Sequence, residues 1–117
     1  MATIVPTITY PEKKVARAVW AGLASGSLVG QAQNFSRYKE ITIHVHGVIG
    51  GSTVQLKGSN DGSQYQTLTV DGSNLASFTT TSIRTLAAFP ISLLPEITAN
   101  ASGSTNVTVE IVGRGRS

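Results

Sequence analysis

The chain has 117 residues, no cysteine, 13% charged residues and a formal net charge of +3. This length predicts one domain, which can bury a hydrophobic core without help from a metal or a disulfide. The absence of cysteine excludes disulfides, thiolate nucleophiles and cysteine-ligated zinc or iron–sulfur sites. The cations are spread along the chain and are not clustered with aromatic residues, so we expect no nucleic-acid partner.

Hydrophobic residues occur only in short runs along the sequence. No run approaches the roughly 20 residues that a membrane-spanning helix needs, so we expect no membrane partner. Residues 1–10 lack both the basic start and the continuous apolar stretch of a secretion signal. We therefore expect a soluble protein that is made in the cytoplasm.

The first residues predict an extended segment. Residues 1–12 hold two prolines among β-branched residues, and proline cannot donate a hydrogen bond to a sheet. We interpret them as an N-terminal arm or edge segment outside the core. In the following stretch, Lys13–Trp20, the alanines would allow two helical turns. Alternating residues and the glycines that follow favour a strand that ends near Leu23, with a connecting loop over Gly26–Arg37.

The stretch Glu40–Val70 is the clearest β-signal in the chain. Ile41, Ile43 and Val45 alternate with polar residues, which is the period of two of a half-buried strand. Gly50-Gly51 interrupts this pattern, and a second alternating run follows before the turn at Gly58–Gly62. We therefore predict three strands in an antiparallel meander over residues 38–70.

Further strands are expected in the second half of the chain. Leu75–Thr81 is rich in Thr, Ile83–Leu94 contains Pro90 at the start of a new strand or at a crossing between sheets, and Asn106–Gly113 alternates regularly. A polar loop is expected over Ala99–Thr105. About seven to nine short strands predict an all-β fold, a β-sandwich or jelly roll over residues 13–113, followed by a short basic tail over 114–117.

His44 and His46 share one face of a predicted strand, about 7 Å apart. Two imidazoles could begin a metal site, but zinc needs a third and usually a fourth ligand. With no other His or Cys in the chain, a carboxylate would have to converge on them from Asp61, Asp71, Glu96 or Glu110. We therefore interpret the pair as strand histidines that face solvent or a subunit, and we expect no metal.

Asn60-Asp61-Gly62 resembles a fragment of a calcium loop, but the spaced acidic pattern of such a loop is missing. We expect Asn60 and Asp61 to cap the backbone of a turn in which Gly62 takes a positive φ. The acidic residues are scattered singly, and no Ser or Thr has a base and an orienting acid at a recognisable spacing. We therefore expect neither a cofactor nor an enzyme.

The order of features resembles a family of small tailed-bacteriophage virion proteins over roughly residues 13–114. The elements that match are Val19–Leu23, Gly47–Gly51, Val54–Gly62, Tyr65, Leu68, Asp71-Gly72 and Ser104–Val109. Two departures stand out. Leu94-Pro95 stands where members often carry Arg-Pro, and Tyr65 stands where tryptophan is frequent.

The resemblance implies a β-sandwich decoration or cement protein on the outer surface of a virion head, bound to the lattice of the major capsid protein. It also implies a homotrimer and no catalytic residue. Two other hypotheses stay open. One is a carbohydrate- or receptor-binding module that uses Trp20, Tyr10, Tyr38 or Tyr65 for stacking, although such rings in a small sandwich are usually core residues. The other is a metal- or calcium-dependent enzyme.

Overall fold

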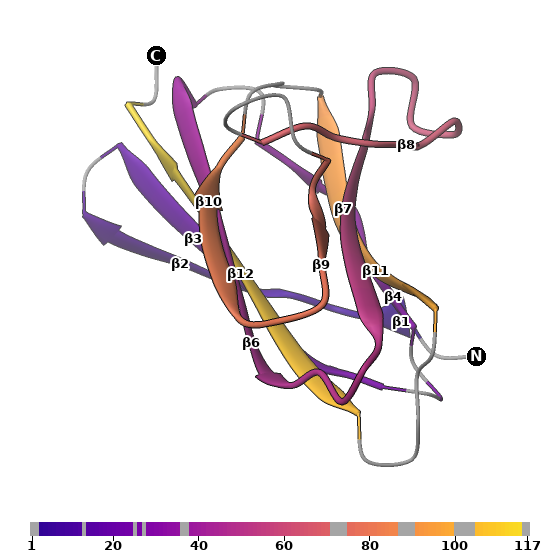
Figure 1. Ribbon diagram of the computed structural model, residues 1–117. Coiled ribbons are helices and arrows are strands. Elements are labelled where there is room, and N and C mark those ends of the chain that lie inside the picture. The colour runs from indigo at the N-terminus through magenta and orange to yellow at the C-terminus, as the bar shows by residue number, and fades with distance from the viewer. Residues whose placement is uncertain are drawn as a thin grey trace.

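The computed structural model shows two β-sheets packed face to face (Figure 1). The residues it describes are 3–12, 14–24, 26, 28–35, 38–70, 75–86, 91–99 and 105–115. They form twelve strands, several of which are only two residues long and therefore too short to be recognised from sequence. The all-β sandwich expected from sequence is confirmed. None of the described residues forms a helix long and apolar enough to cross a membrane.

The first sheet has five antiparallel strands, and its middle strand is the last in the sequence. β12 (Asn106–Arg114) lies between β3 (Val15–Leu23) and β6 (Glu40–Val48). β2 (Thr7–Glu12) and β10 (Ser82–Thr85) form the two edges. The predicted strands at Lys13–Leu23 and Asn106–Gly113 are thus confirmed, and β12 continues through Arg114.

The second sheet has seven strands built around the pair β7 (Thr53–Ser59) and β11 (Ser92–Ala99). Its shorter strands are β1 (Thr3–Ile4), β4 (Val29–Gly30), β5 (Gln33–Asn34), β8 (Gln66–Thr67) and β9 (Ser77–Phe78). Two of them, β4 and β5, lie within the stretch that was expected to be a loop. The Thr-rich strand expected over Leu75–Thr81 is reduced to β9.

The period of two in the sequence becomes the division between core and surface. On β12, Val107, Val109 and Ile111 are fully buried between the sheets, while Thr108 and Glu110 lie on the outer face. Burial of the apolar side chains from both sheets is the main stabilising force of such a sandwich. The same alternation on β3 and β6 places the polar side chains of the five-stranded sheet on its outer face.

The predicted meander over residues 38–70 is wrong in its first connection. β6 and β7 do not pair, because β6 belongs to the five-stranded sheet and β7 to the seven-stranded sheet. The chain crosses between the sheets after Gly50 and Gly51, which both have positive φ. Alternation could not reveal the crossing, since a strand of either sheet directs its apolar residues into the same core. The second connection is confirmed, because β7 pairs with β8.

The N-terminal segment touches both sheets. β1 pairs with β4 at one edge of the seven-stranded sheet, and β2 pairs with β3 at one edge of the five-stranded sheet. The N-terminal segment is therefore extended and runs along one edge of each sheet (Figure 1). The neighbouring strands β9 and β10 also belong to different sheets. β9 pairs with β7 of the seven-stranded sheet, and β10 pairs with β6 of the five-stranded sheet. Pro90 and most of the expected loop over 99–105 lie outside the described residues.

Candidate functional site

The Gly58–Gly62 turn is held together by Asp61. Its Oδ1 accepts hydrogen bonds from the backbone N–H groups of Ser63 and Gln64, both at 2.9 Å, and from the Ser59 hydroxyl at 2.7 Å. These hydrogen bonds, led by the one from Gln64, hold the pKa of Asp61 far below its ordinary value. Gly62 has a φ of +78°. The interpretation of this element as turn chemistry is confirmed for Asp61 and Gly62.

Asn60 contributes to the same region by a longer-range contact. Its Oδ1 accepts a hydrogen bond of 3.0 Å from the backbone N–H of Ile91, just before β11 begins. The turn after β7 is therefore tied to the start of the neighbouring strand. The hydrogen bonds of Asp61 and Asn60 therefore stabilise the turn and its attachment to β11. The Asp61 Oδ1 atom is already occupied by groups of the turn itself.

A polar cluster lies on the outer face of the five-stranded sheet, formed by Arg17 of β3, His44 and His46 of β6, and Glu110 of β12. Glu110 is at its centre, since β12 runs between the other two strands. His44 and Glu110 are direct cross-strand partners, and Glu110 is in turn opposite Val19. We call these four residues the His–Glu cluster.

The two oxygens of Glu110 have different partners. Oε1 accepts from Arg17, at 2.8 Å from Nε and 2.5 Å from Nη2. Oε2 accepts a hydrogen bond of 2.6 Å from His46 Nε2 and lies 3.9 Å from His44 Nδ1. The two imidazole rings are 4.5 Å apart between centroids, closer than strand spacing alone predicts, because the side chains lean toward one another.

The surroundings of Glu110 act on its pKa in two directions. Partial burial, which leaves 17% of the side chain exposed, raises the pKa. The hydrogen bonds from His46 and Arg17 and the positive charge of Arg17 lower it and outweigh burial. The pKa of Glu110 is therefore below its ordinary value, and the group is a carboxylate at neutral pH.

Of the four carboxylates considered from sequence as partners of His44 and His46, the structure brings Glu110 to them. Glu96 instead forms an ion pair with Lys57 on the seven-stranded sheet, with 3.1 Å between Oε1 and Nζ. Asp61 accepts hydrogen bonds within the Gly58–Gly62 turn, and Asp71 lies outside the described residues. Alternation placed both histidines and Glu110 on outward faces, but the register that joins them was not readable from the sequence.

The four aromatic residues considered for stacking are not gathered into one platform. Trp20 is fully buried and donates a hydrogen bond of 2.9 Å from Nε1 to the carbonyl of Gln31. Tyr38 packs on the core beside Phe35, with ring centroids 5.4 Å apart. Tyr10, on β2, is 68% exposed. Tyr65 precedes β8, and Figure 1 shows β2 and β8 at opposite sides of the molecule.

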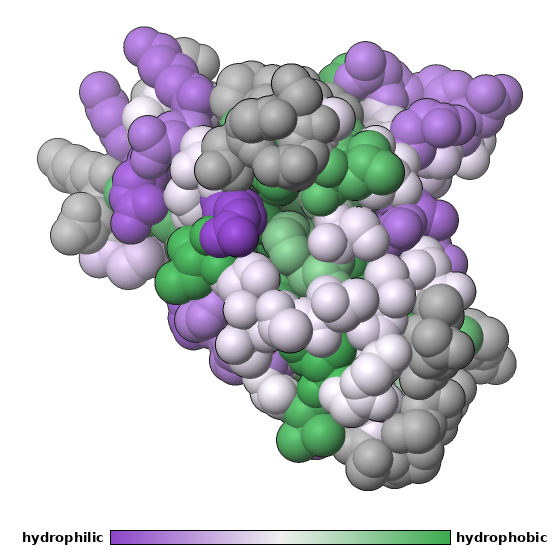
Figure 2. Space-filling view, in the orientation of Figure 1, coloured by the Kyte–Doolittle hydropathy of each residue, from purple (hydrophilic) through white to green (hydrophobic). Residues whose placement is uncertain are grey.

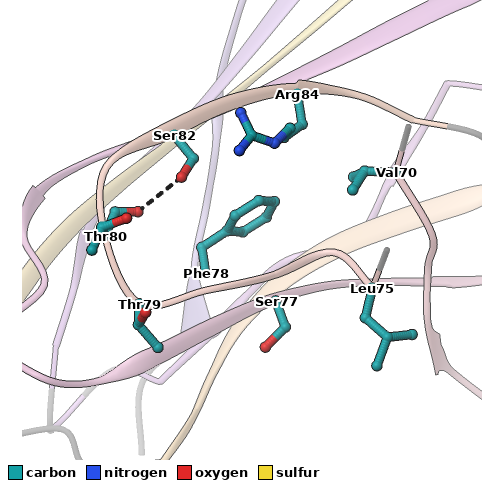
Figure 3. A pocket seen from close by; sticks show the side chains of 8 residues that line it. All are labelled: Val70, Leu75, Ser77, Phe78, Thr79, Thr80, Ser82 and Arg84. Atoms are coloured by element: carbon teal, nitrogen blue, oxygen red, sulfur yellow. Dashed lines mark hydrogen bonds between the residues drawn. The ribbon is translucent and has the colours of Figure 1, made fainter. Parts of the chain in front are cut away.

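A hollow of about 250 Å³ lies beside β9 and β10. Its lining residues are Val70, Leu75, Ser77, Phe78, Thr79, Thr80, Ser82 and Arg84. Figure 3 shows the Phe78 ring and the Arg84 guanidinium on facing segments of the chain, with the hydroxyl groups of Thr80 and Ser82 at one end. The hollow therefore combines a ring, a cation and neutral hydroxyl groups.

The surface around this hollow has little charge. Figure 2 shows a face that is mostly pale, the colour of residues with intermediate hydropathy, with green hydrophobic patches. Purple hydrophilic residues lie at the upper corners and along the left side, and one deep purple group lies nearer the middle. Exposed apolar side chains are dispersed over strands and connecting segments of the molecule, namely Val5, Ile8, Tyr10, Val48, Leu75, Ile83 and Ile91.

The fold has a known counterpart. The chain is similar to the crystal structure of the SPBc2 prophage-derived protein YomS, with a TM-score of 0.61 over 92% of this chain and 100% of that chain. The two sequences are 14% identical, so the likeness concerns the fold alone. No family model and no curated protein sequence matches this chain.

Proposed function

We propose that this chain is a non-enzymatic structural protein of a bacteriophage, which decorates or cements the capsid lattice through many small protein contacts. The observation that carries the phage assignment is the likeness in fold to a prophage-derived protein over 92% of the chain. The decoration or cement role rests on the order of sequence motifs, which resembles phage virion proteins. The partners are the major capsid protein and further copies of this chain, and the location is the outer surface of the virion.

The N-terminal segment offers the contact surface for self-association. Val5 is 67% exposed and Tyr10 is 68% exposed, and both lie in the segment that runs along the sheet edges. Exposed edge strands with apolar side chains pair readily with another chain. Three copies joined in this way form a closed symmetric trimer, and a trimer binds a lattice several times at once.

Copy number in purified virions tests the placement on the capsid. Quantitative mass spectrometry should find the chain in hundreds of copies per particle, in a fixed ratio to the major capsid protein. A handful of copies, or recovery only with isolated tails, would show that the chain is not a decoration protein.

Light scattering coupled to size exclusion tests the trimer. We expect three copies in the wild type and one copy when Val5→Ser and Tyr10→Ser are combined, because the exposed apolar contacts are removed. Leu75→Ser, which alters an exposed apolar residue outside this segment, is the matched control and should remain trimeric. A monomeric wild type would contradict the trimer.

A second candidate function is favoured by the hollow beside β9 and β10. A sugar can hydrogen-bond to an arginine and to neighbouring hydroxyls, and Arg84, Thr80 and Ser82 line the hollow with these groups, whereas the Phe78 ring is buried and adds only an apolar wall. The chain would then be a carbohydrate- or receptor-binding module of the virion. A glycan array with the wild type and Arg84→Met decides this: binding that disappears in the variant supports it, and an array without binding contradicts it.

A further inference from the structure

The His–Glu cluster contains three metal-ligand groups on two neighbouring strands. One ligand atom from each of His44, His46 and Glu110 lies within 4.8 Å of the other two. The side chains reach this arrangement from the sheet face, where His44 and His46 are 42% and 36% exposed. An ion from solvent therefore has direct access to all three groups.

The donor set selects a class of ion. Two imidazole nitrogens and one carboxylate are a common ligand set for zinc, with bonds of about 2.0–2.2 Å and a fourth position filled by water. Calcium and magnesium prefer sites built from oxygen ligands, which this cluster does not provide. Zinc and its neighbours nickel and copper accept imidazole readily.

Small movements of the side chains suffice for binding. His46 Nε2 donates its proton to Glu110 Oε2, so a metal ion bound by both atoms takes the place of that proton. The 2.6 Å contact has to open by a fraction of an ångström, and His44 Nδ1 at 3.9 Å from Oε2 has to move closer. The backbone can stay fixed, since residues 44 and 110 are already cross-strand partners.

Arg17 has two effects on such a site. Both of its contacts are to Oε1, so it fixes the orientation of the carboxylate and leaves Oε2 facing the histidines. Ligating carboxylates are commonly held by a second hydrogen-bond partner in this way. Its positive charge opposes that of the ion, so we expect weaker binding than in sites whose surroundings carry negative charge.

We propose that His44, His46 and Glu110 bind one divalent transition-metal ion of the zinc class on the outer face of the five-stranded sheet, with water completing the coordination. The site goes beyond a decoration or cement function, which needs no metal, and it departs from the expectation drawn from the sequence that His44 and His46 bind none. Its position on an exposed face leaves the fold intact whether or not the ion is bound.

Zinc chloride titrated into the full chain at pH 7.5 tests the proposal. Calorimetry should give one ion per chain. His46→Gln and Glu110→Gln should each weaken binding by more than about tenfold, since even the loss of an outer hydrogen-bond partner costs that much at metal sites. Glu96→Gln is the matched control because it removes a paired carboxylate from the other sheet, and it should bind zinc like the wild type.

A second measurement needs no variant to bind or fold. The chain has only two histidines, so both imidazole resonances can be followed by NMR in the wild type. Zinc should shift both of them together, with saturation at one equivalent. The proposal is overturned if neither resonance moves, if only one moves, or if Glu96→Gln loses zinc as the ligand variants do.

Discussion

Gly30 of β4 lies directly against the indole ring of Trp20 of β3. A Cβ placed on Gly30 would be 2.5 Å from Trp20 Cδ1 and 2.7 Å from Pro95 Cγ. Trp20 belongs to the five-stranded sheet and Gly30 to the seven-stranded sheet, so this contact sets the distance between the sheets at that point. The indole N–H bonds to the carbonyl of Gln31, the residue after the glycine, and this holds the ring in place.

Gly30→Ala should therefore destabilise the protein by about 1–3 kcal/mol, the usual cost of forcing an extra methyl group into a packed core. Urea unfolding followed by the fluorescence of Trp20, the single tryptophan, measures the change. Gly26→Ala is the control, because nothing lies within 4 Å of a Cβ at that position. A loss of stability equal in both variants would show that the indole contact is not the cause.

Gly47→Ala should be destabilising for two separate reasons. The φ of Gly47 is +102°, and strain at such a position costs about 1–3 kcal/mol for other residues. A Cβ there would also lie 2.5 Å from the backbone oxygen of Asn106. That oxygen cannot move without disrupting the pairing of β12 with β6.

Gly22→Ala separates these two effects in the same unfolding experiment. Gly22 also has a positive φ, of +86°, but nothing lies within 4 Å of its added Cβ. We expect Gly47→Ala to lose clearly more stability than Gly22→Ala. Equal losses would mean that backbone strain alone accounts for both.

Asp61→Asn should lower the melting temperature at neutral pH, because a neutral amide accepts the turn hydrogen bonds less strongly than a carboxylate. The folded state lowers the pKa of Asp61, so its carboxylate stabilises the fold above the pKa of the unfolded chain. That contribution is lost as the pH falls below about 4. Melting curves from pH 7 to pH 2 should show the two proteins converging, whereas a constant difference would contradict the role of the charge.

The ion pair between Lys57 and Glu96 should contribute little to stability. Both side chains are about a quarter exposed, and partly exposed pairs typically give 0.2–1 kcal/mol. A double-mutant cycle with Lys57→Met and Glu96→Gln measures the coupling free energy directly. A coupling above about 2 kcal/mol would show that this pair is far better shielded from water than its exposure indicates.

Strands that carry their own signal were predictable from the sequence. The alternation of Ile41, Ile43 and Val45 and of Val107, Val109 and Ile111 predicted two strands and their buried faces, and the structure confirms both. The turn at Asp61 was equally local. Its hydrogen bonds join residues two or three positions apart, so the residue types alone predict them.

Features that depend on which strand lies next to which were not predictable from the sequence. The crossing between β6 and β7 changes sheet without changing the direction of the apolar side chains, so alternation is the same in either arrangement. Glu110 was one of four candidate carboxylates for His44 and His46, and the sequence could not choose among the four for a related reason. Glu110 and His46 are 64 positions apart, and only the register between β6 and β12 brings them together.

The position of β12 also affects how the protein can fold during synthesis. β3 and β6 are translated long before β12, yet each of them has β12 as a neighbour in the finished sheet. Until residues 106–114 leave the ribosome, the nascent chain therefore carries two strands with unpaired edges, which are prone to associate with other chains. The five-stranded sheet can close only after translation has passed its last strand. A chaperone would protect this protein most effectively in that interval.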